Sequence, residues 1–241
     1  MLETGSEINL EVHEDSVTVH DLSDKTFESF CVAMAKVIAG QYEKELLVKA
    51  INKRCSDFYR TDKIEIWKIA MSHLYNEKIA LDSDYFDRIN LVKESLRNFL
   101  KDSDLLSVQG FVNFRLSEYK EALEELAEHS AEEYKVDCEY REFVMMLKYF
   151  ISLQMPKYID VHIFYGTDVL IFGDGINVTE EYAEEYKSEI GASTENKDDF
   201  ILNSLILMAP KKIKLIITDV VPEKEFVDTL KSVFENKISI N

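Results

Sequence analysis

The chain has 241 residues, of which 46% are hydrophobic and 31% charged, so it can bury a sizeable core. Its net charge of −18 at pH 7 argues against general affinity for nucleic acid or anionic membranes, because such binding depends on lysine and arginine. The three cysteines, Cys31, Cys55 and Cys138, are far apart and form no CxxC motif, which indicates neither a disulfide framework nor a zinc site.

No segment reaches the ~18 uncharged apolar residues of a membrane-spanning helix, and residues 1–16 lack the pattern of an export signal. We therefore expect a cytoplasmic protein that does not enter a membrane. All three prolines, Pro156, Pro210 and Pro222, lie toward the C-terminus. Their absence from the first 155 residues favours a mainly helical region there.

The first elements are a hairpin and a long helix. Alternating apolar and polar residues at 8–21 predict two short strands. From Asp24 the apolar residues follow a helical period to about Cys55, behind a cap at Ser23 or Asp24. Gly40 inside this helix predicts a kink or a close helix contact, since glycine costs roughly 1 kcal/mol there relative to alanine.

Helical periods return at residues 61–74 and 83–100, with Trp67 expected in the core. A further helical stretch runs from about Gly110 to Ile151 and is expected to be interrupted by an acidic turn at Asp137. Together these segments predict a helical bundle that follows the hairpin and occupies residues 1–155.

Residues 156–241 differ in pattern. β-rich runs at 159–165 and 169–172 predict a hairpin. A short strand at 176–178 and helices at 179–190 and 198–208 are expected to follow. A strand at 212–218, a helix from Pro222 and a strand at 238–240 predict a parallel right-handed crossover. The fold class is therefore α+β, with a C-terminal α/β module that contains a small mixed sheet.

The segment SVQGFVNFRLSEYK, residues 107–120, concentrates aromatic and polar residues where an acidic helix begins. Phe111, Phe114 and Tyr119 would cover most of a helix surface, which predicts burial. Asn113 and Arg115 would then need partners, because an unpaired buried polar group costs roughly 1–3 kcal/mol. A structural network in which Arg115 pairs with a carboxylate is the first interpretation, and a ligand or partner site is the second.

Other candidate residues give weaker signals. His13, His20 and His162 lie on predicted strands. Two of them could bind a metal ion together only if their strands share one sheet. His73 and His129 are expected at the surface, and no ExxH or HExxH motif accompanies the many glutamates. The sequence therefore predicts no metal site and no cofactor.

A basic cluster is formed by Lys211, Lys212 and Lys214 together with Lys157. It is interpreted as the solvated start of a strand or as a docking patch for an acidic partner. Nucleic acid is not an expected ligand, because the net charge of the chain opposes it.

Several segments resemble one known family. These are GFVNFRLSEY at 110–119, YREFVMMLKYFISLQMPK at 140–157, VHIFY at 161–165 and ILNSLILMAPKKIKL at 201–215. Together they resemble the YtxC family of sporulation proteins from spore-forming Gram-positive bacteria, in order over residues 108–234. The resemblance implies a cytoplasmic protein connected with sporulation, and it implies no reaction, since the family brings no assigned activity or catalytic residues.

Two functional hypotheses follow. The first is a non-enzymatic factor that binds another protein, because no catalytic constellation accompanies the apolar helices. The alternative is an enzyme or small-ligand binder with a pocket between the two halves, around Arg115 and Asn113, with Tyr119 and His162. The oligomeric state is left open.

Overall fold

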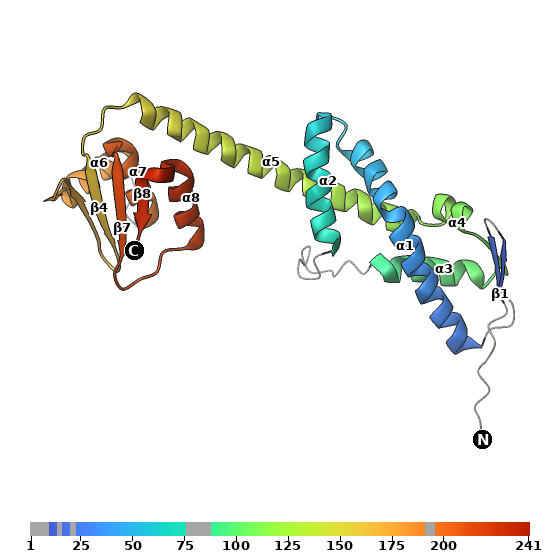
Figure 1. The fold of residues 1–241 in the computed structure, drawn as a ribbon. Helices are drawn as coiled ribbons and strands as arrows, with labels where there is room; N and C mark the ends of the chain where they lie inside the picture. Colours follow the sequence, from blue (N-terminus) through green and yellow to red (C-terminus); the bar gives the residue numbers. More distant parts are fainter. Residues whose placement is uncertain (1–9, 14–15, 20–22, 76–87, 191–195) are drawn as a thin grey trace, which may run out of the picture. The chain divides into compact units, whose positions relative to one another are not determined.

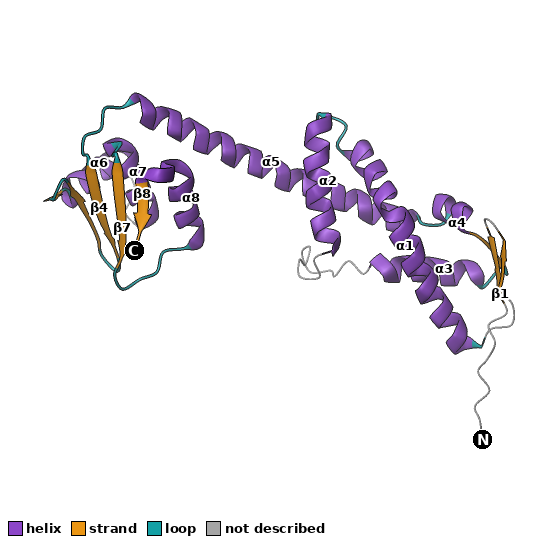
Figure 2. Ribbon diagram, viewed as in Figure 1, coloured by secondary structure: helices purple, strands orange, loops and turns teal. Residues whose placement is uncertain are grey.

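The computed structural model describes residues 10–13, 16–19, 23–75, 88–190 and 196–241. The chain forms two compact units, residues 1–136 and 137–241 (Figure 1). Helices dominate the first unit, whereas the second combines a sheet with helices (Figure 2). The α+β fold class is therefore confirmed. The sequence-based boundary at 155/156 followed the change in composition, whereas the division at 136/137 falls within a continuous helix.

The first unit begins with a small antiparallel sheet. Strands β1 (Leu10–His13) and β2 (Ser16–Val19) pair in register from Leu10 opposite Val19 to His13 opposite Ser16, which confirms the hairpin. A third strand, β3 (Leu105–Ser107), pairs with β2 and was not predicted. Three residues are too few to show a period of two, so β3 carries no sequence signal of its own.

The described helices of the first unit are α1 (Asp24–Arg54), α2 (Arg60–Tyr75), α3 (Arg88–Leu100), α4 (Val108–Phe114) and the first part of α5 (Ser117–Leu153). The Ser23 hydroxyl caps α1 by accepting a hydrogen bond from the Thr26 amide at 3.4 Å, as the sequence predicts. Helix α1 packs along α3, and its buried stripe includes Ile38, Leu47 and Ile51. Trp67 is only partly buried, although it packs against this core.

Gly40 offers a direct test of helix propensity. It lies in the middle of α1 and is exposed, and no atom lies within 4 Å of the point that a Cβ would occupy, so the predicted close helix contact at Gly40 is wrong. Gly40→Ala should therefore raise the free energy of unfolding by about 0.5–1 kcal/mol, because alanine loses less backbone entropy. Urea unfolding followed by Trp67 fluorescence measures this gain. Lys36→Ala, at an exposed position one turn earlier, should change it by less than about 0.5 kcal/mol.

The segment 107–120 does not form one helix. Ser107 caps α4 by accepting a hydrogen bond from the Gly110 amide at 3.3 Å, and α4 ends at Phe114 with Arg115 as its C-cap. Helix α5 then begins at Ser117. It runs without interruption past Asp137, so the acidic turn predicted there is wrong. Glutamate and lysine are good helix formers, and a helix can remain intact where its whole circumference is solvated.

The second unit contains a five-stranded mixed sheet in the order β6-β5-β4-β7-β8. Its strands are β4 (Asp160–Tyr165), β5 (Val169–Gly173), β6 (Ile176–Asn177), β7 (Lys212–Ile217) and β8 (Ile238–Ile240). The β4–β5 hairpin is antiparallel, whereas β7 pairs in parallel with both β4 and β8. The connections are α6 (Thr179–Ile190), α7 (Lys197–Met208), α8 (Lys224–Phe234) and a 3₁₀ turn, η1 (Glu235–Lys237). The predicted hairpin and strand-helix-strand unit are confirmed.

The core of the second unit lies on one face of this sheet. Alternate residues of the central strands, such as Ile163 and Leu215, pack against α6, α7 and α8. Val144 and Ile151, near the C-terminal end of α5, join the same core. This packing explains why the compact units divide within α5 and not at its end.

Asp219 links the end of β7 to the turn after β4. Its carboxylate accepts hydrogen bonds from the Thr167 amide at 3.0 Å and from the hydroxyls of Thr167 and Thr218. The Thr167 hydroxyl, followed by these other donors, lowers the Asp219 pKa from 3.8 to about 2. Because the folded-state pKa of Asp219 is depressed, its ionised, hydrogen-bonded carboxylate stabilises the fold above about pH 4. This stabilisation is lost as the pH falls toward 2.

The expected result is that Asp219→Asn shows a weaker loss of stability than the wild type between pH 4 and pH 2. Thermal unfolding at half-unit pH intervals measures the difference. Identical pH profiles for the two proteins would contradict the role assigned to Asp219.

Candidate functional site

The structure places the predicted polar pair at the surface. Asn113 and Arg115 are both exposed, and Phe114 is 82% exposed, so their expected burial inside an apolar surround is wrong. The physical reason is that helix α4 ends at Phe114. The short helix is oriented so that only Phe111 and Val112 enter the core. The Asn113 carbonyl accepts a hydrogen bond from the Lys120 ammonium at 2.7 Å.

Tyr119 is buried in a network that the sequence did not reveal. Its hydroxyl donates a hydrogen bond to Glu43 of α1 at 3.0 Å. The Arg88 guanidinium, at the start of α3, donates to both oxygens of the same carboxylate at 2.9 Å. Glu43 is only 2% exposed, so this carboxylate depends on its two partners. The network joins three helices and leaves Tyr119 with a structural role.

Arg115 lines a polar hollow of about 400 Å³ in the first unit, together with Glu118 of α5 and Phe99 of α3. Its guanidinium carbon lies 5.6 Å from the centre of the Phe99 ring, a cation–π distance. Within the described part of the chain no carboxylate forms an ion pair with Arg115, so the predicted pairing is not formed. Asn113 does not line this hollow.

The remaining predicted site residues belong to the second unit. His162 is half-buried on β4, on the sheet face opposite the core. It shares no sheet with His13, because β1 and β4 belong to different sheets. His20 lies outside the described residues. Lys211 and Lys212 are exposed where β7 begins, and the Lys157 ammonium lies 5.4 Å from the centre of the Tyr182 ring.

Two of the three cysteines have buried thiols. Cys31 and Cys55 are buried in the first unit. Burial raises the pKa of Cys31 to about 11 and also raises the pKa of Cys55. Both thiols therefore remain protonated at neutral pH, which disfavours a nucleophilic role.

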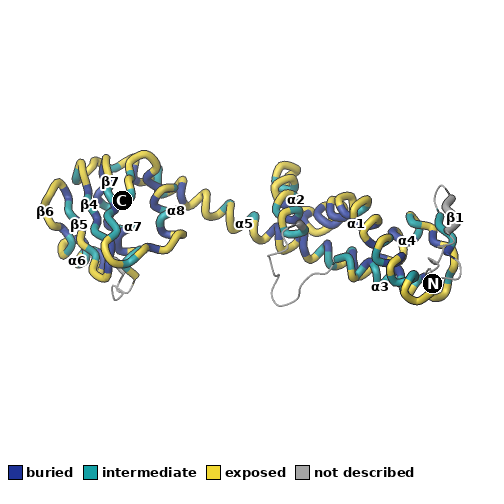
Figure 3. Tube along the Cα trace, turned by 60° about the horizontal axis from the view of Figure 1, so that its bottom comes forward, coloured by how far each residue is buried: buried dark blue, intermediate teal, exposed yellow. Residues whose placement is uncertain are grey.

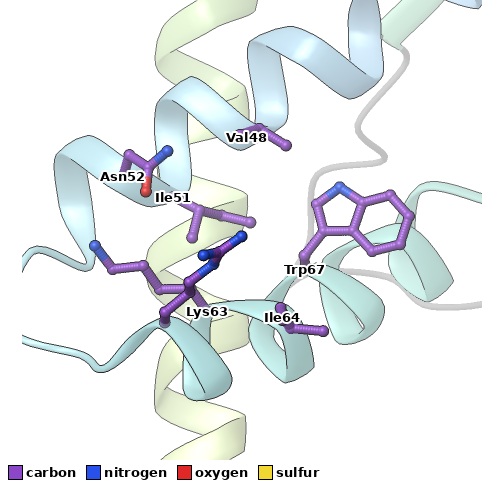
Figure 4. A pocket seen from close by; sticks show the side chains of 7 residues that line it. Val48, Ile51, Asn52, Lys63, Ile64 and Trp67 are labelled. Carbon is purple, nitrogen blue, oxygen red and sulfur yellow. The ribbon is translucent and has the colours of Figure 1, made fainter.

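A small apolar pocket lies between α1 and α2 (Figure 4). Val48 and Ile51 on α1 face Ile64 and Trp67 on α2, and the volume is about 280 Å³. Asn52, Arg60 and Lys63 supply its polar lining. This volume is below the roughly 300–1,000 Å³ of typical small-molecule sites, so the pocket suits a single apolar side chain.

An exposed apolar stripe lies on α5. Five side chains of the second unit form it, each between 45% and 67% exposed, and we call them the α5 apolar surface: Phe143, Met146, Tyr149, Phe150 and Leu153. At 100° per residue they occupy one side of the helix, opposite Val144 and Ile151. The exposed length of α5 is yellow in Figure 3.

The opposite side of α5 in this unit contacts α8 and η1. The Lys148 ammonium pairs with Glu235, and the Tyr140 and Thr229 hydroxyls lie 3.2 Å apart. Met145 lines a groove of about 630 Å³ that α5 forms with α8. The α5 apolar surface is therefore held outward by packing on the opposite side of the same helix.

One cluster of metal-ligating side chains is present among the described residues. His73 of α2 and His129 and Glu133 of α5 place one potential ligand atom each within 4.8 Å of one another. His73 Nε2 lies 2.7 Å from a Glu133 oxygen, and the two imidazole rings are 5.6 Å apart. The His73 side chain is only 8% exposed, so its predicted surface position is wrong, whereas His129 is exposed as predicted.

Comparison with known proteins places the chain in a family. The sequence profile of the YtxC-like family matches residues 29–239. The chain belongs to the YtxC-like family. This membership confirms the resemblance seen in the sequence.

A relative from Bacillus subtilis (strain 168), described as uncharacterized protein YtxC, is 23% identical over 151 residues. The match covers 62% of this chain and 53% of the relative, so it spans about half of the relative's length. No solved structure matches the chain. Among the described helices, none combines the length and apolar character needed to cross a bilayer.

Proposed function

We propose that this YtxC-like protein is a non-enzymatic binding factor that takes an amphipathic helix of a partner protein on the α5 apolar surface. The observation that carries the proposal is the exposure of Phe143, Met146, Tyr149, Phe150 and Leu153 on one side of a single helix. Contiguous exposed apolar patches are uncommon on soluble proteins and mark interaction sites. Methionine suits such a surface because its flexible side chain adapts to a partner.

The spacing of these residues favours a helical partner. Phe143, Met146, Phe150 and Leu153 follow each other at intervals of three, four and three residues. This is the spacing of the a and d positions of a coiled coil, at which side chains of one helix insert between those of another. A helix that lies along α5 would cover the whole stripe at once.

Charge favours a basic partner over a second copy of this chain. Glu139 and Glu142 are exposed just before the stripe, and the protein carries a net charge of −18. Two such chains repel each other, whereas lysine or arginine beside the apolar face of a partner helix would pair with these glutamates. We place this interaction in the cytoplasm of sporulating cells, a setting that rests on the resemblance to sporulation proteins.

The test uses a Met146→Ser/Phe150→Ser variant of the full chain, since both side chains are exposed and the fold should tolerate their loss. Proteins captured by the wild type and by the variant from sporulating cells are compared by quantitative mass spectrometry. A control, Tyr59→Ser, removes an aromatic side chain that is 81% exposed in the first unit.

At least one partner should be recovered by the wild type and by the control but be depleted about thirtyfold with the double variant, since hot-spot residues contribute 2 kcal/mol or more. Equal recovery of every protein by all three baits would refute the proposal.

A further inference from the structure

The cluster of His73, His129 and Glu133 comes from two helices of the first unit. His129 and Glu133 are four residues apart on α5, so they lie one turn apart on the same side of the helix. His73 lies in the last turn of α2 and brings its Nε2 to 2.7 Å from Glu133. The set of two imidazoles and one carboxylate is assembled from separate elements and is not a run of acidic residues.

The buried histidine is incompletely satisfied. The His73 side chain is 8% exposed, yet its Nδ1 atom is buried and has no hydrogen-bond partner among the residues that the structure describes. A metal ion bound at Nε2 would leave this Nδ1 atom unpaired, so the ligand role of His73 rests on the position of Nε2. Only Nε2 is engaged, and it is directed at the carboxylate that would share a metal ion with it.

The distances suit a small divalent ion after a minor adjustment. Zinc–nitrogen and zinc–oxygen bonds of about 2.0–2.2 Å in a tetrahedral site separate ligand atoms by roughly 3.3 Å. His73 and Glu133 would move apart by roughly half an ångström from their hydrogen bond, and a ligand pair at the 4.8 Å limit would close by roughly 1.5 Å. Because His129 and Glu133 are exposed, their side chains are able to make this adjustment while the buried His73 ring stays in place.

We propose that His73, His129 and Glu133 bind one zinc ion, which ties the end of α2 to α5. Two imidazoles and a carboxylate form a ligand set that zinc accepts with a fourth position left for water. The negative charge of the protein attracts the cation. The described residues provide no acceptor for His73 Nδ1, so the affinity falls below that of zinc sites with a complete outer shell.

The experiment titrates the metal-free full-length chain with ZnCl2 by calorimetry and with Co²⁺ by visible absorption, which reports tetrahedral coordination. Three variants are compared with the wild type: His129→Ala, Glu133→Gln and Glu132→Gln. The first two each remove a proposed ligand at an exposed position. Glu132→Gln removes a neighbouring carboxylate outside the ligand set and is the matched control.

The wild type and Glu132→Gln should bind one zinc ion with similar affinity, and zinc should raise the unfolding midpoint reported by Trp67 on the same helix as His73. His129→Ala and Glu133→Gln should bind at least about a hundredfold more weakly, since loss of an outer-shell partner alone costs 10–100-fold. Absence of saturable binding to the wild type, or equal affinity in all four proteins, would overturn the proposal.

Discussion

Arg88→Ala is expected to lower the free energy of unfolding of the first unit by about 3 kcal/mol. Arg88 donates to both oxygens of Glu43, which is 2% exposed in the core between α1, α3 and α5. Without the guanidinium, the Glu43 carboxylate keeps only Tyr119 among the partners described above and stays in a region of low polarity. The loss of stability therefore comes from the buried Glu43 carboxylate, which has lost its cationic partner.

Urea unfolding monitored by Trp67 fluorescence measures this effect, because Trp67 is the only tryptophan and packs against the same core. Arg97→Ala is the matched control on the same helix. Its pairs with Glu28 and Glu94 span 3.8 and 3.5 Å at the surface and should contribute less than about 1 kcal/mol.

A Glu43→Leu/Arg88→Met variant should recover most of the lost stability, because replacing both members of a buried pair by apolar residues is often neutral. If Arg88→Ala and Arg97→Ala cost the same, the importance of the buried network is contradicted.

Ile163→Ala should lower the stability of the second unit by about 3 kcal/mol. Ile163 is fully buried on β4, the central strand of the sheet, with β5 on one side and β7 on the other. Truncation to alanine removes apolar contacts and leaves a cavity that the paired strands cannot easily fill.

Hydrogen exchange resolved by peptide is the appropriate measurement, since it assigns the loss to particular strands. Protection of β4 and β7 amides should fall about a hundredfold. Leu170→Ala on the adjacent β5, where the side chain is 43% exposed, should leave protection within about fivefold of the wild type. Equal effects of the two substitutions would argue against a core on this face of the sheet.

Most of the fold was predictable because hydrophobic periodicity and capping residues indicate the same helices and strands. The Ser23 cap begins α1, and the hairpin at 10–19 and the β4–β5 hairpin follow alternation or turn residues. The break between α4 and α5 was missed because Arg115 and Leu116 carry none of the glycine or proline signals that end helices. The false turn at Asp137 arose because charge interrupts the apolar stripe of α5 without ending the helix.

The site was less predictable because pairing across helices has no local signature. In the sequence Glu43 resembles any solvated glutamate of a charged helix, yet tertiary packing buries it beside Arg88. His129 and Glu133 could have been noticed as a pair four residues apart, but His73 comes from a distant helix. The exposure of the α5 apolar surface has no sequence signal, because apolar residues at helical spacing fit a buried face equally well and only part of the helix circumference has a partner.

The proposed binding function is tested most directly by a photocrosslinking amino acid placed at Tyr149 in the full chain, in sporulating cells. Tyr149 lies within the α5 apolar surface and is 67% exposed, and a probe at Tyr59 in the first unit is the control. We predict a discrete crosslink from position 149 alone, mapped by mass spectrometry to an amphipathic helix that carries basic residues. A crosslink to a second copy of this chain, or no crosslink from position 149, would contradict it.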